Sequence, residues 1–339
     1  MMGRGLRAIA ALALILPGAA ATQRGPAAAP QAYQPPRHSA PSPLMTGASP
    51  REVMARADSG TQIERDRAPA AELDEHRKLD RALRALTPQR PGVVDAYVVS
   101  IALDSDPVFG REARVAGDVL RRRYGGLGRT IVLAGSDGGA PSALPRGSPA
   151  TLAIVLARIA ELMDRQEDVL VLYTTSHGAP FGLYYNDGDN GYGAISPDRM
   201  AAVLDQLGLS NRLLIFSACF SGVFVPRLQS ASSVIVTAAS ADRSSFGCLA
   251  ENDWTFFGDA MINHALRKAQ PLGAAFAEAN GLVAGWEAQF QVPPSRPQFF
   301  LGAGVGRWLD PLERRTPRAA TQPVGRPAID SSRAAMLRR

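Results

Sequence analysis

The alternation of apolar runs with helical segments between residues 91 and 310 constrains the fold of this chain more than any other feature. The runs at 97–103, 169–173 and 213–216 are almost continuously apolar and do not alternate with polar residues. Such runs are typical of a parallel sheet, because helices bury both of its faces. We therefore predict one α/β domain with a mainly parallel central sheet and helices on both faces.

The expected elements follow one another in a regular order. Strands are expected at 93–103, 129–135, 168–175, 212–217, 232–240 and 297–302. Helices are expected at 111–125, 148–165, 196–208, 253–268 and 271–289, with a hairpin-like stretch at 182–196. In sheets of this kind, functional groups gather beyond the carboxyl ends of the strands.

The positive charge of the chain lies at its two ends. The formal net charge is +6, of which residues 1–50 carry +4 and residues 311–339 carry +5, so the middle of the chain stands at −3. Because the predicted domain itself is not basic, we expect no nucleic-acid partner.

Composition divides the chain into five parts. A predicted signal peptide at 1–21 precedes a Pro/Ala-rich linker at 22–50. Leucines at near-helical spacing predict a helical N-terminal segment at 51–90, for which we keep open a role as a prodomain over the site. The folded domain covers 91–310, and the arginine-rich residues 311–339 are predicted to form a basic, disordered tail.

The first residues have the pattern of an export signal. Arg4 and Arg7 precede an apolar run at 8–16, and three alanines at 19–21 suit a signal peptidase. We predict an exported protein, periplasmic or extracellular in a bacterium, with retention of the signal as an anchor as the alternative. No later run is long enough to span a bilayer, so no integral membrane segment is expected after cleavage.

Two predicted strands end in residues that can do chemistry. One ends in "SHG" with His177, and another ends in "SACFSG" with Cys219, which follows 42 positions later. If these strands are neighbours, the two side chains meet at one edge of the sheet. A cysteine needs an activating neighbour to be a good nucleophile, and a histidine supplies this or protonates the leaving amine. The sequence therefore predicts a Cys/His dyad.

Small residues beside the dyad leave room for a substrate. The N–H groups of Gly178 and Cys219 are candidates to bind an oxyanion, an effect worth about 3–4 kcal/mol where a single donor has been removed. Cys248 is interpreted as a packed thiol; a disulfide with Cys219, which would abolish activity, is the alternative.

The chain contains no recognisable motif for binding a metal or a nucleotide cofactor. No Cys/His set has zinc spacing, and the acidic stretch 186–193 lacks the spacing of an EF-hand. No glycine-rich stretch has the lysine of a phosphate loop. We expect no metal and no cofactor.

These motifs resemble the legumain family of cysteine peptidases, which has a caspase-like fold and includes the catalytic subunit of the GPI-anchor transamidase. The resemblance rests on "SHG", "SACFSG", "VTAASADRSSFGC" at 236–248 and "FFGD" at 256–259, and more weakly on "FGREARVAG" at 109–117. It covers residues 93–270, and it is specific because the blocks occur together.

The resemblance implies roles for six residues. His177 is expected to be the catalytic base and acid, Cys219 the nucleophile and Gly178 an oxyanion contributor. The positions that match the family's asparagine pocket are Arg111, Ser244 and Asp259. Arginine with aspartate suits an amide side chain, which needs both donors and acceptors.

The sequence departs from the family pattern at two positions. Ser176 stands where the family has an acid before the histidine, and Phe220 stands where it has an acid after the cysteine. We therefore predict a legumain-type cysteine endopeptidase for protein or peptide substrates, with cleavage after asparagine only weakly implied. A transpeptidase using the same acyl-enzyme and a catalytically silent envelope-binding module are the alternatives. The oligomeric state is not readable.

Overall fold

The computed structural model describes residues 38–134 and 142–330; the predicted signal peptide, most of the predicted linker and residues 331–339 lie outside these ranges. Its centre is a six-stranded sheet in the order β10-β9-β8-β4-β2-β3. All neighbouring strands are parallel except β10, which pairs antiparallel with β9. The predicted α/β class with a mainly parallel sheet is confirmed.

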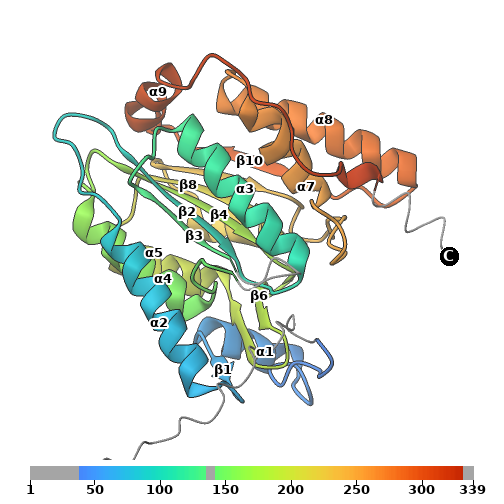
Figure 1. Cartoon of the computed structure of the whole chain (residues 1–339). Helices are drawn as coiled ribbons and strands as arrows, with labels where there is room; N and C mark the ends of the chain where they lie inside the picture. The colour runs from blue at the N-terminus through green and yellow to red at the C-terminus, as the bar shows by residue number, and fades with distance from the viewer. Residues whose placement is uncertain (1–37, 135–141, 331–339) are drawn as a thin grey trace, which may run out of the picture. The chain divides into compact units, whose positions relative to one another are not determined.

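The strands of this sheet alternate with helices along the chain (Figure 1). The strands are β2 (Ala96–Ala102), β3 (Thr130–Leu133), β4 (Val169–Thr175), β8 (Arg212–Ser217), β9 (Ser233–Thr237) and β10 (Gln298–Leu301). The helices are α1 (Pro50–Asp58), α2 (Pro69–Arg84), α3 (Pro107–Arg123), α4 (Pro149–Leu162), α5 (Pro197–Gln206), α6 (Val225–Leu228), α7 (Phe256–Gly258), α8 (Leu272–Phe290) and α9 (Gly306–Arg314). Shorter turns are the 3₁₀-helices Ser221–Phe224 and Ala265–Arg267 and the π-helix Asp259–His264.

Helices cover both faces of the sheet, as expected for strands that are apolar throughout (Figure 1). One core joins α3, α8 and α9 to one set of strand residues, such as Val98 and Val171. The other core joins α2, α4 and α5 to the alternate set, such as Val99 and Leu172. Successive residues of a strand point to opposite faces, so each strand contributes to both cores.

The starts of α4 and α5 follow from local sequence. Ser148 and Ser196 cap these helices, and their hydroxyl groups accept hydrogen bonds of 3.0 Å from the backbone N–H groups of Thr151 and Arg199. A proline follows each cap, where its missing N–H group costs nothing.

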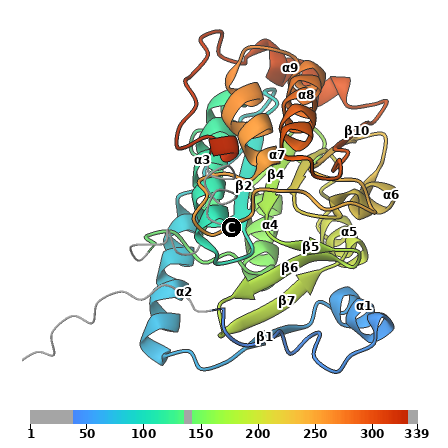
Figure 2. The same cartoon turned by 90° about the vertical axis from the view of Figure 1, so that its right-hand side faces the viewer.

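A small antiparallel sheet lies beside the main one (Figure 2). Its order is β1 (Gln62–Glu64), β7 (Gly191–Ile195), β6 (Gly182–Asp187) and β5 (Gly178–Ala179). The predicted hairpin thus forms β6 and β7, and the N-terminal segment adds β1 to its edge. Since β5 begins one residue after His177, this sheet is attached directly to the strand end of interest.

The C-terminal segment differs from the disordered tail predicted from residue 311. Residue 311 lies inside α9, whose Trp308 and Leu312 are buried in the core. Residues 321–328 then run back over the molecule through backbone hydrogen bonds to Arg267, Trp254, Asn263 and Asp259. An arginine-rich composition indicated disorder, but backbone groups make most of these contacts, and composition does not report on them.

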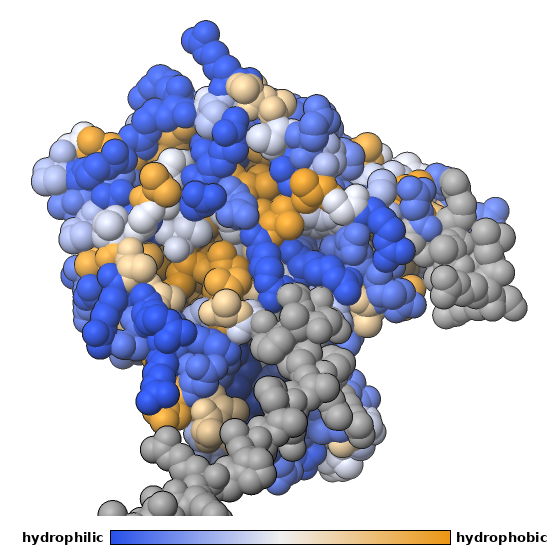
Figure 3. Space-filling view, in the orientation of Figure 1, coloured by the Kyte–Doolittle hydropathy of each residue, from blue (hydrophilic) through white to orange (hydrophobic). Residues whose placement is uncertain are grey.

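The surface that carries α2 and α3 is mixed. Figure 3 shows apolar patches separated by hydrophilic side chains on this face. Among the described residues, no helix is long and apolar enough to cross a membrane.

Candidate active site

The two strand ends predicted to meet are neighbours in the sheet. β4 and β8 pair in parallel from Leu170–Arg212 to Thr175–Ser217. The N–H group of Ser176 extends this ladder with a bond of 3.2 Å to the carbonyl of Ser217. His177 and Cys219 therefore follow the paired strands at matching positions, two residues beyond the last pair.

Cys219 lies in a tight turn between β8 and the 3₁₀-helix at 221–224. The next residue, Phe220, has a φ of 57°, a left-handed conformation that is unfavourable for residues other than glycine. Its N–H group donates a bond of 2.8 Å to the carbonyl of Arg243. The turn is thus held in a strained form, as is common where a side chain is presented at a functional site.

The sulfur of Cys219 faces the loop after β9. The backbone N–H of Ser245 donates to Sγ at 3.2 Å, and the hydroxyl of the same serine lies 3.6 Å away. Cys219 is half-buried and forms no disulfide, and neither does Cys248.

His177 is surrounded by groups from three other segments. Its Nε2 lies 3.6 Å from Oδ2 of Asp106, the residue that precedes α3. The ring of Phe109 meets the imidazole edge to face, with centroids 5.0 Å apart. Cys248 interacts with the imidazole from the loop after β9. The side chain remains 39 % exposed, so a substrate can reach it.

These neighbours determine the charge of His177. Burial alone would lower its pKa, but Asp106, Cys248 and Asp104 act in the opposite direction and raise the pKa to about 11. Asp106 has a lowered pKa because it bonds to His177, and burial raises the pKa of Asp104 to about 6. At neutral pH the imidazole is therefore an imidazolium, a form that can protonate a leaving amine.

Gly178 lies where a side chain would not fit. A Cβ atom at this position would be 2.1 Å from the carbonyl oxygen of Cys219. The glycine thus lets the backbone after His177 approach the backbone of Cys219 closely. The close approach explains why glycine follows His177, whether or not its N–H group binds an oxyanion.

Beneath the strand ends, Glu112 ties β4 and β8 together. Its carboxylate is fully buried and accepts hydrogen bonds of 2.8 Å from Thr175 of β4 and from Ser217 of β8. Tyr173 donates a third bond, and Thr255 donates two more through its N–H and hydroxyl groups. Five donors satisfy the buried carboxylate, so the residues two positions before His177 and Cys219 share one anchor.

The three predicted pocket residues are not brought together by any contact among the described residues. Arg111 donates to the carbonyls of Ala250 and Asn252 and lies 3.8 Å from Asp253. Ser244 is exposed in the loop after β9, next to the serine that contacts Cys219.

Asp259 is fully buried and is bound by other parts of the chain. Its carboxylate accepts hydrogen bonds from Asn263 and from the N–H of Ala328 in the C-terminal segment, both at 2.8 Å. Burial raises its pKa. An asparagine side chain would have to displace these partners before it could use Asp259.

Sequence reasoning missed Asp104, Asp106, Glu112 and Cys248 as members of the site. A signal for the first two was present, because "DSD" at 104–106 follows the apolar run of β2 directly. β2 pairs with β4, so these aspartates had to lie beside His177. Nothing local in the sequence marked Glu112 or the approach of Cys248.

One cluster offers metal-type ligands. His38, Asp104 and Asp106 present atoms within 4.8 Å of one another. His38 already contacts Ser105 through Nε2 and Asn186 through Nδ1, each at 3.0 Å. The arrangement is accounted for by hydrogen bonds within the protein.

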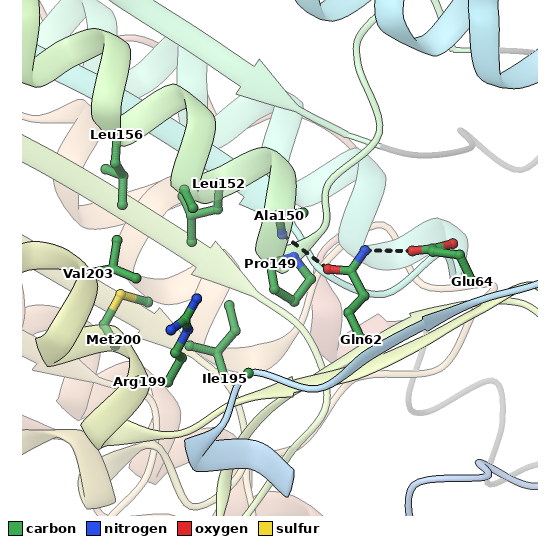
Figure 4. A pocket seen from close by; sticks show the side chains of 12 residues that line it. Gln62, Glu64, Pro149, Ala150, Leu152, Leu156, Ile195, Arg199, Met200 and Val203 are labelled. Carbon is green, nitrogen blue, oxygen red and sulfur yellow. Dashed lines mark hydrogen bonds between the residues drawn. The ribbon is translucent and has the colours of Figure 1, made fainter.

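A pocket of about 380 Å³ lies between α4 and α5, under β1 and β7 (Figure 4). Leu152, Leu156, Met200 and Val203 point into it, with Arg199 at its side. Its lining contains no cysteine or histidine, and none of the predicted site residues belongs to it. This pocket is therefore separate from the strand ends that carry His177 and Cys219.

Comparison with known proteins shows one family similarity. Residues 152–297 match the model of the peptidase C13 family, a range that includes both His177 and Cys219 but not Arg111. The solved structure of caspase-1 from Spodoptera frugiperda is similar over 61 % of this chain and 86 % of that chain, with 15 % sequence identity and a TM-score of 0.41. A search of curated proteins gives no significant match.

Proposed function

We propose that this chain, which carries a peptidase C13 family domain, is an exported cysteine-type endopeptidase of the legumain type. Membership in that family implies a cysteine peptidase with a protein or peptide substrate. The observation that carries the proposal is the parallel pairing of β4 with β8, which sets His177 and Cys219 at one sheet edge within the family region.

The geometry supports a thioacyl mechanism. The thiolate of Cys219 attacks the substrate carbonyl carbon, and a C–S bond forms as the carbonyl oxygen becomes an oxyanion. His177 as imidazolium gives its proton to the nitrogen of the leaving amine, and the C–N bond breaks. The now neutral imidazole takes a proton from water as the water attacks the thioester carbonyl. The C–S bond then breaks, which releases the carboxylic acid and restores the thiolate of Cys219 and the imidazolium of His177.

Turnover of fluorogenic peptides with Asn, Asp, Arg or Lys before the scissile bond tests the proposal. Cys219→Ala and His177→Ala are each expected to lower kcat by a factor of at least about 1,000, as is typical when one member of a catalytic pair is removed. His76→Ala is the matched control, because His76 is exposed on α2. Turnover that survives in Cys219→Ala would refute the peptidase mechanism.

The same panel reads out specificity. A preference for Asn would mean that Arg111 and Asp259 exchange their present partners for the substrate. No preference for Asn would mean that these contacts persist during turnover.

A further inference from the structure

Asp106 occupies a helix start without capping the helix. It is the N-cap residue of α3, where an aspartate commonly accepts a hydrogen bond from the second or third N–H group of the helix. Its carboxylate makes no such bond. The two oxygens are divided between two imidazoles, with Oδ2 3.6 Å from Nε2 of His177 and Oδ1 3.5 Å from Nε2 of His38.

His38 belongs to an N-terminal arm, defined here as residues 38–48, that is fastened beside the site. The N–H groups of Ser39 and Ala40 both donate to the carboxylate of Asp189 in the β6–β7 turn, at 2.9 and 2.8 Å. His38 itself is held by Ser105 and Asn186. The arm therefore has anchors of its own, so Asp106 is not needed to keep it in place.

The other groups that face His177 are weaker holders of an imidazolium. Asp104, at the end of β2, is buried, and burial raises its pKa to about 6, so it is less ready to carry a charge than Asp106. Cys248 contributes a thiol, and Phe109 contributes a ring edge without charge. Cys219 lies beyond the end of β8, the strand that neighbours β4. Of these groups, Asp106 alone combines a carboxylate within 4 Å with a lowered pKa.

We propose that Asp106 is the positioning residue of His177, holding the imidazole in its charged form and fixing its orientation toward the strand end that carries Cys219. The positive end of α3 stabilises the carboxylate, because a helix N-terminus favours negative charge. Phe109, one turn into the same helix, fixes the plane of the ring from a second side. One helix start thereby sets both the charge and the tilt of the His177 imidazole.

The first measurement is the titration midpoint of His177 in the full chain. It is read by ¹⁵N NMR of the imidazole from about pH 6 to about pH 12, a range that brackets the pKa of about 11. The chain has four histidines, so single His→Gln variants assign the signals. Asp106→Asn is expected to lower the titration midpoint by at least about one pH unit, since a charge within 4–6 Å shifts a pKa by 1–3 units. Asp106→Glu, which keeps the charge, should restore most of the shift.

Two controls isolate the role of the carboxylate. His38→Gln removes the other imidazole from Asp106 and should move the midpoint by less than about half a unit, because the groups that raise the pKa of His177 are Asp106, Cys248 and Asp104. Asp198→Asn alters an exposed aspartate in the first turn of α5 and should leave it unchanged. An unchanged midpoint in Asp106→Asn, with the fold intact by circular dichroism, would overturn the proposal.

Kinetics supply the second measurement and rest on the proposed peptidase function. Asp106→Asn should lower kcat by about 10- to 100-fold, as expected for a misplaced catalytic group, while KM changes less than about threefold. The descending alkaline limb of kcat/KM should move to lower pH, because the imidazolium is lost earlier. A merely structural aspartate would lower activity without moving this limb.

The two hypotheses fail in different ways. If Cys219→Ala keeps full turnover, the peptidase mechanism fails, yet the NMR midpoint still tests the role of Asp106. If Cys219→Ala and His177→Ala abolish turnover but Asp106→Asn changes neither midpoint nor alkaline limb, the positioning role alone is wrong.

Discussion

Two regions that share the strands β4 and β8 are built in opposite ways. Beneath the strand ends, Glu112 is fully buried and its carboxylate accepts five hydrogen bonds. Above them, His177 is 39 % exposed and is held by one carboxylate at 3.6 Å, one thiol and one ring edge. The lower region fixes backbone positions, whereas the upper region leaves side chains free to exchange partners.

The contrast shows how one part of the site fixes the backbone while another leaves a side chain able to exchange protons. A satisfied buried carboxylate is costly to disturb, because each donor that it leaves unpaired carries a desolvation penalty. A catalytic imidazole must instead lose and regain a proton in every cycle. Placing the rigid network two residues before His177 and Cys219 orders the site without engaging the reacting atoms.

Removing the buried network should have the largest effect on stability. Glu112→Ala leaves the hydroxyls of Tyr173, Thr175 and Ser217 without their acceptor, so we expect the free energy of unfolding to fall by about 3 kcal/mol or more. Chemical denaturation measures this. Glu161→Gln, at an exposed position on α4, is the control and should change stability by less than about 0.5 kcal/mol. A loss below 1 kcal/mol for Glu112→Ala would show that the network is not an anchor.

A methyl group at Gly178 should separate the two regions. The added Cβ would lie 2.1 Å from the carbonyl oxygen of Cys219, so the backbones that follow β4 and β8 must move apart. We expect Gly178→Ala to cost about 1–3 kcal/mol of stability and to lower kcat by about 100-fold. Gly273→Ala is the matched control, because a Cβ there meets no atom within 4 Å. Equal turnover in both variants would contradict this close approach.

A third change tests the region that contains the predicted specificity residue Asp259. Asn263 bonds to Asp259 and also accepts from and donates to the backbone of Val324, which ties the C-terminal segment to the molecule. Asn263→Ala should lower the free energy of unfolding by about 1–3 kcal/mol and make residues 315–330 more sensitive to limited proteolysis. Asn280→Ala, exposed on α8, is the control. Unchanged cleavage of the segment would show that other contacts hold it.

The sheet and the neighbouring positions of His177 and Cys219 were predictable because both follow from regular patterns. Continuous apolar strands alternating with helices indicate a parallel sheet, and residues after parallel strands share one edge. This rule alone predicts that His177 and Cys219 lie at the same edge of the sheet. The same rule applied to "DSD" after β2 would have placed Asp106 beside His177.

The surroundings of the dyad were less predictable because they depend on irregular segments. The partners of Arg111 are carbonyls at 250 and 252, set by a loop that has no periodic pattern. Contacts such as His38 with Ser105 or Ala328 with Asp259 join residues 67 and 69 positions apart through single hydrogen bonds. Arg111 and Asp259 were matched to a motif, but a motif specifies residue types and leaves their partners open.

The smallest expected effect concerns the strained turn at Phe220, where the two regions join. Its φ of 57° suits glycine, so Phe220→Gly should be more stable than Phe220→Ala by about 1 kcal/mol, although both lose the same ring. The difference between these two variants isolates backbone strain from side-chain packing, and chemical denaturation measures it. If the rigid network around Glu112 imposes the turn, both variants should keep kcat within about threefold of each other, because the turn has the same shape in each. A clearly lower kcat in Phe220→Gly than in Phe220→Ala would mean that the freer glycine backbone loosens the turn, and that the network around Glu112 does not by itself fix the backbone at Cys219.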